Sequence, residues 1–310
     1  MGGCDFFVRR AIPGIGSGPS LIKQNELMSN FADVASSYAS FDTAASALRC
    51  LHYRQRILEV SQRVAALHIA GAFSALEMMD CIYHGLMRRD ANGSSPDTFI
   101  LSKGHAGIAQ YVVLEKMSVL SHSDLDLYCK PGGRLGCHPD YGVPGIEAST
   151  GSLAHGLGLS VGMAHADRLL KADRKIYLLM SDGEFQEGSV WESMMMGANL
   201  GVKNLIGFLD HNGFQSFGRT RDNHPKFYPI REKVEAFGWE CVEVDGHDTD
   251  AIYRAVLNRK GDRPFLLVGN TVKGRGVSYM ENEPIWHFRS PNASEYVKAL
   301  TELEKNYREK

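Results

Sequence analysis

Three carboxylates follow an apolar run within a single turn of the chain. Asp182, Glu184 and Glu187 come directly after the segment 175–180, KIYLLM, where a buried strand is expected to end. Such a group could form a metal site, an acid–base pair or a solvated surface. Asn212 follows the next apolar run, one helix and one strand later. Because ligands of open α/β sheets bind beyond the carboxyl ends of the strands, Asp182 and Asn212 are expected at one mouth.

The residue types at this mouth suit a divalent cation. Carboxylate and amide oxygens are hard ligands for Mg²⁺ or Ca²⁺, and Mg²⁺ with few protein ligands usually pairs with a phosphorylated ligand. Gly183 gives the backbone room for the turn, and the helix expected after it points its N-terminal amides at the same place, which favours an anion. An acidic helix start would explain Asp182 alone. Asn212 at this spacing favours the metal site.

The elements that must position these residues alternate between strands and helices. Short apolar runs predict strands at 175–180, 204–209, 239–244 and 265–272. The intervening segments predict helices at 185–200, 228–237 and 249–259, and a last, solvated helix is expected at about 293–309. This alternation predicts an α/β fold with a mostly parallel sheet and helices on both faces.

The first part of the chain has a different character. Residues 1–44 include a Gly/Pro/Ser-rich stretch and carry little sustained periodicity, so we expect a flexible N-terminal arm. The α/β pattern then fills residues 45–310, which we interpret as one folded domain.

Composition excludes several classes of protein. The 310 residues are 44% hydrophobic and 23% charged, with a formal net charge of −2, so binding to nucleic acid is not expected. No apolar run reaches the roughly 18 residues that span a bilayer, and no signal peptide is recognisable, so no membrane association is expected. The six cysteines have no paired spacing, which favours free thiols and a cytoplasmic protein.

Five segments, in order, resemble the transketolase family. SDGEFQEG at 181–188, followed by NLIGFLDHNGF at 204–214, resembles its thiamine diphosphate fingerprint, a Gly-Asp-Gly followed by Asn. The other matching segments are 67–77, 99–106, 136–164 and 273–287. The resemblance spans about residues 47–300. It implies the thiamine diphosphate-binding fold, with thiamine diphosphate and Mg²⁺ (or Ca²⁺) as cofactors.

The resemblance also implies a role for each matching residue. Mg²⁺ would be held by Asp182, Asn212 and the backbone carbonyl of Phe214, and Asn212 would also contact the cofactor. Residues implied around the diphosphate are Gly183, Glu184, His105, Lys273 and His287. Gly151 and Leu153 would pack through their backbone against the rings of the cofactor.

Four histidines, His68, His105, His138 and His287, match those that line the donor channel of the family. Histidine carries protons near neutral pH, as chemistry on sugar hydroxyls requires. Glu187 resembles a carboxylate buried at a subunit interface near the cofactor, and it is grouped with these histidines as a catalytic residue.

The resemblance covers one domain of a larger family architecture. Transketolases continue into a pyrimidine-binding domain and a C-terminal domain, so the resemblance implies the N-terminal subunit of a split transketolase, inactive without a partner in an α₂β₂ assembly. Such an enzyme transfers a two-carbon ketol unit from a ketose phosphate donor to an aldehyde or other acceptor. Two alternatives stay open: the α subunit of a 2-oxo-acid dehydrogenase or decarboxylase, and a non-catalytic module that keeps the fold.

Three departures from the family pattern bear on these expectations. Ser181 replaces the first Gly of Gly-Asp-Gly, which is tolerable if its φ is negative, and Ala154 replaces a usual Gly in a later loop. Phe288 and Arg289 follow His287 where the family usually has Gly-Lys. A bulky Phe beside a catalytic histidine is expected to reshape the donor or acceptor channel.

Overall fold

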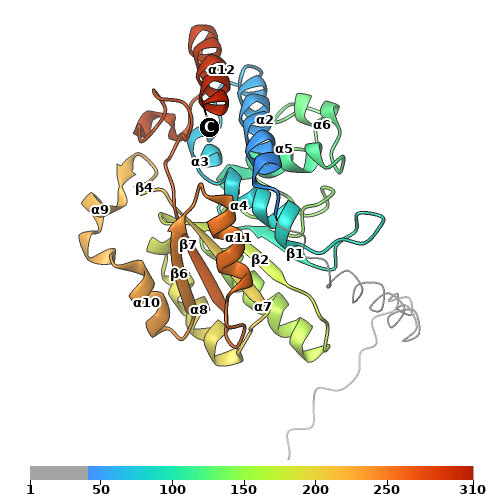
Figure 1. Cartoon of the computed structure of the whole chain (residues 1–310), viewed down its shortest axis with the longest axis vertical. Coiled ribbons are helices and arrows are strands. Elements are labelled where there is room, and N and C mark those ends of the chain that lie inside the picture. Colours follow the sequence, from blue (N-terminus) through green and yellow to red (C-terminus); the bar gives the residue numbers. More distant parts are fainter. Residues whose placement is uncertain (1–40, 310) are drawn as a thin grey trace, which may run out of the picture.

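The computed structural model describes residues 41–309, and its elements are drawn in Figure 1. The predicted arm, residues 1–44, lies outside the described residues apart from 41–44. The first described helix, α2, begins at Thr43. Asp42 caps α2, because its side chain accepts a hydrogen bond from Ala45 N–H at 2.9 Å.

Five described strands form one parallel sheet. They are β1 (Thr98–Leu101), β2 (Ile176–Ser181), β3 (Leu205–His211), β6 (Glu240–Asp245) and β7 (Phe265–Asn270). The spatial order is β1-β2-β3-β7-β6, and every neighbouring pair is parallel. The predicted fold class is confirmed. The register places Ser181, at the end of β2, opposite Asp210 of β3, so the two turns expected to carry the site start side by side.

Helices cover both faces of this sheet (Figure 1). On one side pack α2 (Thr43–Ser61), α3 (Ile69–Phe73), α4 (Leu76–Cys81), α5 (Gly107–Lys116), α11 (Thr249–Leu257) and α12 (Ala293–Arg308). On the other side pack α7 (His155–Leu169), α8 (Gly188–Leu200) and α10 (Ile230–Ala236). The strands serve both cores by alternation: Tyr177 and Leu179 of β2 face the first group, whereas Leu178 and Met180 face the second.

Shorter elements connect these layers. They are η2 (Ile82–Leu86), η3 (Gly104–Ala106), α6 (His122–Asp126), η4 (Glu184–Gln186), β4 (Phe214–Gln215), β5 (Gly218–Arg219), α9 (Thr220–Asn223), η5 (Pro225–Phe227) and η6 (Pro284–His287). The hairpin of β4 and β5 directly follows the Asn212 turn. Among residues 41–309, no helix combines the length and apolar character needed to cross a bilayer.

Local chemistry fixes where the helices start and stop. α12 begins with a capping box: Asn292 Oδ1 accepts from Glu295 N–H at 2.9 Å, and the Glu295 carboxylate accepts from Asn292 N–H at 2.8 Å. α8 ends where Gly201 adopts the left-handed conformation, with φ of 60°, which glycine enters without a steric cost. These ends orient the loops that lead into the sheet.

Candidate active site

A fully buried carboxylate, Asp182, lies between the turns that follow β2 and β3. It accepts hydrogen bonds from Gly183 N–H at 2.9 Å and from Gly213 N–H at 2.6 Å. Burial, with a smaller contribution from the Asp210 carboxylate, raises the pKa of Asp182 to about 8. None of the ion pairs among residues 41–309 includes Asp182. A cation at this position would therefore stabilise the ionised form.

The three residues predicted to bind metal belong to this same pair of turns. Asn212 Oδ1 accepts from Phe214 N–H at 3.1 Å. A Cβ added at Gly183 would lie 3.4 Å from the carbonyl oxygen of Phe214, so only a glycine lets the first turn come this close to the second. Ser181 has no positive φ, so its replacement of a glycine is tolerated as expected.

The four predicted histidines converge around His68. The His68 ring centroid lies 5.3 Å from that of His105, 6.4 Å from that of His138 and 5.0 Å from that of His287. His68 precedes α3, His105 lies in η3 and His287 ends η6. Three separate elements thus deliver histidines that are far apart in the sequence.

The histidine cluster is electrostatically poised to stay neutral. Burial lowers the pKa of His68 to about 4 and that of His287 to about 3, and it holds the pKa of His105 well below its usual value. Positive charge on neighbouring groups, chiefly His138 and Lys273, lowers these pKa values further. Near pH 7 these rings are neutral imidazoles, which can accept a proton or relay one.

Lys273 joins the histidine cluster to the Asp182 turns. Its Nζ donates to the Ser216 carbonyl at 3.0 Å, lies 3.3 Å from His287 Nδ1 and lies 4.9 Å from the centroid of the Phe214 ring. Burial, and then the charge of Lys103, lowers the pKa of Lys273 to about 8. An anion bound here would offset both effects.

The loop with Gly151 is wedged between two site elements. Gly151 has a φ of 141°, and a Cβ on it would lie 2.9 Å from the ring of His138. A Cβ on Gly104, in η3, would lie 2.7 Å from the backbone nitrogen of Gly151. Gly104 was not among the predicted site residues, although it lies in a matching segment. Its missing side chain sets how closely the Gly151 loop approaches His105.

Replacing Gly104 by alanine is expected to destabilise the chain by about 1–3 kcal/mol, the range for overpacking, and to weaken cofactor binding. The methyl group would collide with backbone, which cannot rotate away as a side chain can. Thermal unfolding and thiamine diphosphate titration measure the two effects. Gly162→Ala is the matched control: a Cβ there meets nothing within 4 Å in α7, so stability is expected to be equal or higher. Equal stability of both variants would show that the Gly151 loop is free to move.

Glu184 acts through its carboxylate as well as through any contact of its amide. The carboxylate accepts from Ala154 N–H at 2.7 Å, from Ser181 N–H at 3.3 Å and from the hydroxyl of Ser102. Burial raises its pKa to about 7. Ala154, the residue after Leu153, sits at φ 73°, so this bond fixes a left-handed residue at the start of α7. Glu184 thereby ties the Gly151–Leu153 loop to the ends of β1 and β2.

Glu187 stands apart from this constellation. It precedes α8 as the N-cap residue and is exposed. Within the described part of the chain its side chain forms no hydrogen bond or ion pair, so the structure does not bring it into contact with the four histidines.

The sequence analysis missed a buried ion pair under the site. Lys103 and Asp210 are both fully buried and bonded to each other, and Lys103 Nζ also donates to the Gly71 carbonyl at 2.8 Å. A signal was present, because each of these charges stands at the end of an apolar strand. Their partnership was invisible, because they are more than 100 positions apart in the chain.

The departure after His287 lies directly on the histidine cluster. The Phe288 ring is 47% exposed and its centroid is 4.6 Å from that of His68. Phe217, 59% exposed, approaches His287 at 5.5 Å. Arg289 is engaged elsewhere, since it stacks on Trp286 and pairs with Glu295 at 2.7 Å. The exposed side of the cluster is therefore flanked by two aromatic rings.

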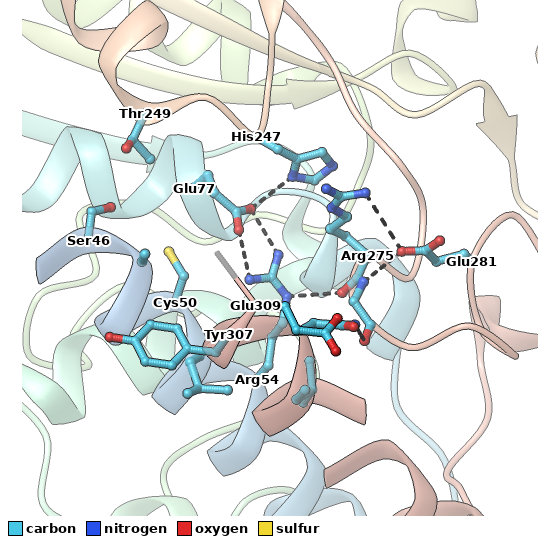
Figure 2. Close-up of a pocket in the computed structure, with 15 residues that line it drawn as sticks. Ser46, Cys50, Arg54, Glu77, His247, Thr249, Arg275, Glu281, Tyr307 and Glu309 are labelled. Atoms are coloured by element: carbon cyan, nitrogen blue, oxygen red, sulfur yellow. Dashed lines mark hydrogen bonds and ion pairs between the residues drawn. The ribbon is translucent and has the colours of Figure 1, made fainter. Parts of the chain in front are cut away.

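A separate cavity of about 480 Å³ supports the site from behind (Figure 2). None of the predicted site residues lines it. In Figure 2, Glu77 lies between Arg54 and His247, and it bonds both. His247 Nε2 in turn accepts from Val272 N–H at 2.9 Å, in the residue before Lys273. This paired network holds the lysine segment against α2 and α4.

The residues present fit a diphosphate with a divalent cation. Beside Asp182 and the two lysines, three nearly buried polar atoms have no partner among the described residues: Thr150 Oγ1, Gln186 Nε2 and Gln215 Oε1. They belong to the Gly151 loop, to η4 and to β4, which are the segments that carry the predicted cofactor residues. Because buried polar groups are normally paired, these atoms indicate a polar ligand.

Comparison with known proteins gives one consistent family. Residues 44–303 match the family described as transketolase, thiamine diphosphate binding domain. The chain is 38% identical over 255 residues to the first of the lettered subunits of the apulose-4-phosphate transketolase of Phocaeicola vulgatus, covering 81% of this chain and 90% of that protein. It is 34% identical over 258 residues to 6-deoxy-6-sulfo-D-fructose transketolase subunit SqwG of a Clostridium species, covering 81% and 94%.

Solved structures show the same fold. The transketolase of Campylobacter jejuni superposes with a TM-score of 0.77 at 22% identity, covering 84% of this chain. This chain spans 42% of that one.

Proposed function

This chain belongs to the transketolase family and carries its thiamine diphosphate-binding domain, and from that premise we propose that it is the N-terminal subunit of a two-subunit transketolase. The proposed reaction moves a two-carbon ketol unit from a ketose or ketose phosphate donor to an aldehyde or other acceptor. The observation that carries the proposal is the convergence of His68, His105, His138 and His287 beside Lys273 and the buried Asp182 turn.

We propose that Asp182, Asn212 and the carbonyl of Phe214 hold Mg²⁺, with Ca²⁺ as a substitute. Residues proposed around the diphosphate and rings are Gly151, Leu153, Gly183, Glu184, His105, Lys273 and His287, with Asn212 in contact with both metal and cofactor. Thiamine diphosphate, when bound, supplies the carbon–carbon chemistry. The protein supplies orientation, charge compensation and neutral imidazoles that can hold or move a proton on sugar hydroxyls.

The rim of the histidine cluster suggests what kind of substrate group it meets. Phe288 and Phe217 offer aromatic faces there, and Arg289 is occupied by Trp286 and Glu295. We therefore propose that the substrate's charged group, if it has one, is bound by residues outside this chain.

A partner is part of the proposal. The relatives named as subunits cover nearly their whole length with this chain. Apolar side chains also gather on the exposed side of α7 and α8, where Leu159, Met195 and Met196 are 46%, 50% and 47% exposed. Glu187, at the start of α8, adjoins this face. We propose contact here with a neighbouring protomer of an α₂β₂ assembly whose other chain carries the pyrimidine-binding domain.

A cytoplasmic location completes the proposal. It rests on the free thiols of Cys50, Cys81, Cys129, Cys137 and Cys241, which a reducing compartment would preserve.

The test is to purify the chain from its native cells, identify what co-purifies, and assay ketol transfer. Fructose 6-phosphate, apulose 4-phosphate and 6-deoxy-6-sulfo-D-fructose serve as donor probes. We expect no turnover by the chain alone, and turnover dependent on thiamine diphosphate and Mg²⁺ once the pyrimidine-binding subunit is present. Release of CO₂ from pyruvate instead would favour the 2-oxo-acid alternative. An assembled complex that binds no cofactor would favour a non-catalytic module.

A further inference from the structure

Asp210 is a buried carboxylate with every side occupied. Its Oδ2 accepts from Ser74 Oγ at 2.6 Å, from Asn212 Nδ2 at 2.9 Å and from Lys103 Nζ, and its Oδ1 accepts from Thr271 Oγ1. These donors come from the end of α3, from the Asn212 turn and from the segments after β1 and β7. A carboxylate so saturated has little left to offer a metal ion.

The same contacts decide which way the Asn212 amide faces. A carboxylate only accepts hydrogen bonds, so the edge of the amide that meets Asp210 Oδ2 must be its NH₂. Oδ1 then points to the opposite side, where it accepts from Phe214 N–H at 3.1 Å. That side carries Gly213, whose N–H bonds the Asp182 carboxylate. A flipped amide would instead present two donor hydrogens there.

We propose that Asp210 is the positioning residue that orients the Asn212 amide oxygen toward the metal site, with Lys103 neutralising Asp210. This inference rests on the proposed role of Asn212 as a metal ligand. The two carboxylates at the ends of β2 and β3 thus have opposite tasks. Asp182 has only two backbone donors and binds the cation, whereas Asp210 spends its oxygens on holding a ligand in place.

The first test is Asp210→Asn in the full chain, assembled with the protein that co-purifies with it. An amide at 210 can meet Asn212 through either edge, so the orientation is no longer dictated. Outer-shell changes of this kind typically cost 10–100-fold in metal affinity. We expect Mn²⁺ affinity, followed by electron paramagnetic resonance with thiamine diphosphate present, to fall by about that factor. An affinity within about twofold of wild type would overturn the inference.

A swapped pair tests the polarity of the contact itself. In the double variant Asp210→Asn with Asn212→Asp, the net charge is unchanged, the amide donates from position 210, and either oxygen of the new carboxylate can face the metal. We expect Mn²⁺ affinity to return to within about tenfold of wild type. A swapped variant that folds but binds no more tightly than the single variant would contradict the proposal.

Thr271→Val is the matched control for stability alone. It removes the donor to Oδ1, the oxygen that does not touch Asn212, so it should lower the unfolding temperature without changing Mn²⁺ affinity. Equal loss of affinity in this variant would assign Asp210 a merely structural role.

One readout needs no variant to fold. In the wild-type protein labelled with ¹⁵N-asparagine, the side-chain NH₂ of Asn212 should be protected from solvent exchange with and without Mg²⁺ and thiamine diphosphate. Rapid exchange in either state would overturn the inference. Asp182→Asn separates the two proposals: unchanged Mn²⁺ binding there refutes the metal site, whereas loss there with unchanged binding in Asp210→Asn refutes only the role of Asp210.

Discussion

Asp182→Asn is expected to remove nearly all Mg²⁺-dependent binding of thiamine diphosphate. The side chain is fully buried, and its two hydrogen-bond donors are backbone N–H groups that an amide oxygen can still satisfy. What the variant loses is the charge, whose ionisation in the buried site requires a nearby cation. Because outer-shell changes alone cost 10–100-fold in metal affinity, loss of a direct ligand should exceed about 100-fold.

Isothermal titration of the cofactor with and without Mg²⁺ measures this effect. The unfolding temperature of the free variant should stay near that of wild type, because the buried carboxyl is replaced by a neutral group of the same shape. Asp262→Asn, at an exposed position paired only with Arg263, is the control and should bind normally. If Asp182→Asn retains Mg²⁺-dependent binding, the metal lies elsewhere.

His287→Ala should lower turnover of the assembled enzyme by about 10²–10³-fold, within the usual range for losing a positioned acid–base group. His287 is the histidine that touches both halves of the site: it contacts His68 and lies 3.3 Å from Lys273 Nζ. Burial and then the charge of Lys273 lower its pKa to about 3, so it is a neutral acceptor at pH 7. Its removal leaves substrate hydroxyls without that acceptor.

Turnover of the reconstituted complex and thermal unfolding should be measured on the same preparation. His287 is only partly buried and ends a short 3₁₀ turn, so folding should change much less than the rate. His52→Ala, an exposed histidine on α2, provides the control and should leave both unchanged. An unaltered rate in His287→Ala would make this histidine a packing residue.

Some of the fold could be predicted because it is local. The apolar runs that became β2, β3, β6 and β7 have strand length and are bounded by turns, and their spacing leaves room for one helix between neighbours. β1 escaped prediction, since Thr98–Leu101 is four residues long and its burial comes entirely from neighbours. Its identity as a strand depends on pairing with β2, which lies far along the chain.

The sequence by itself determined that Asp182 and Asn212 end neighbouring parallel strands, because strand–helix–strand spacing sets which turns share a sheet edge. Only the tertiary structure decided how His68, His105, His138 and His287 meet, that Gly104 must lack a side chain, and that Lys103 neutralises Asp210. These contacts join segments far apart in the chain, so no local period or propensity encodes them. They form when the packed sheet brings its strand ends to one edge, and burial there makes each unpaired charge or misplaced methyl group costly.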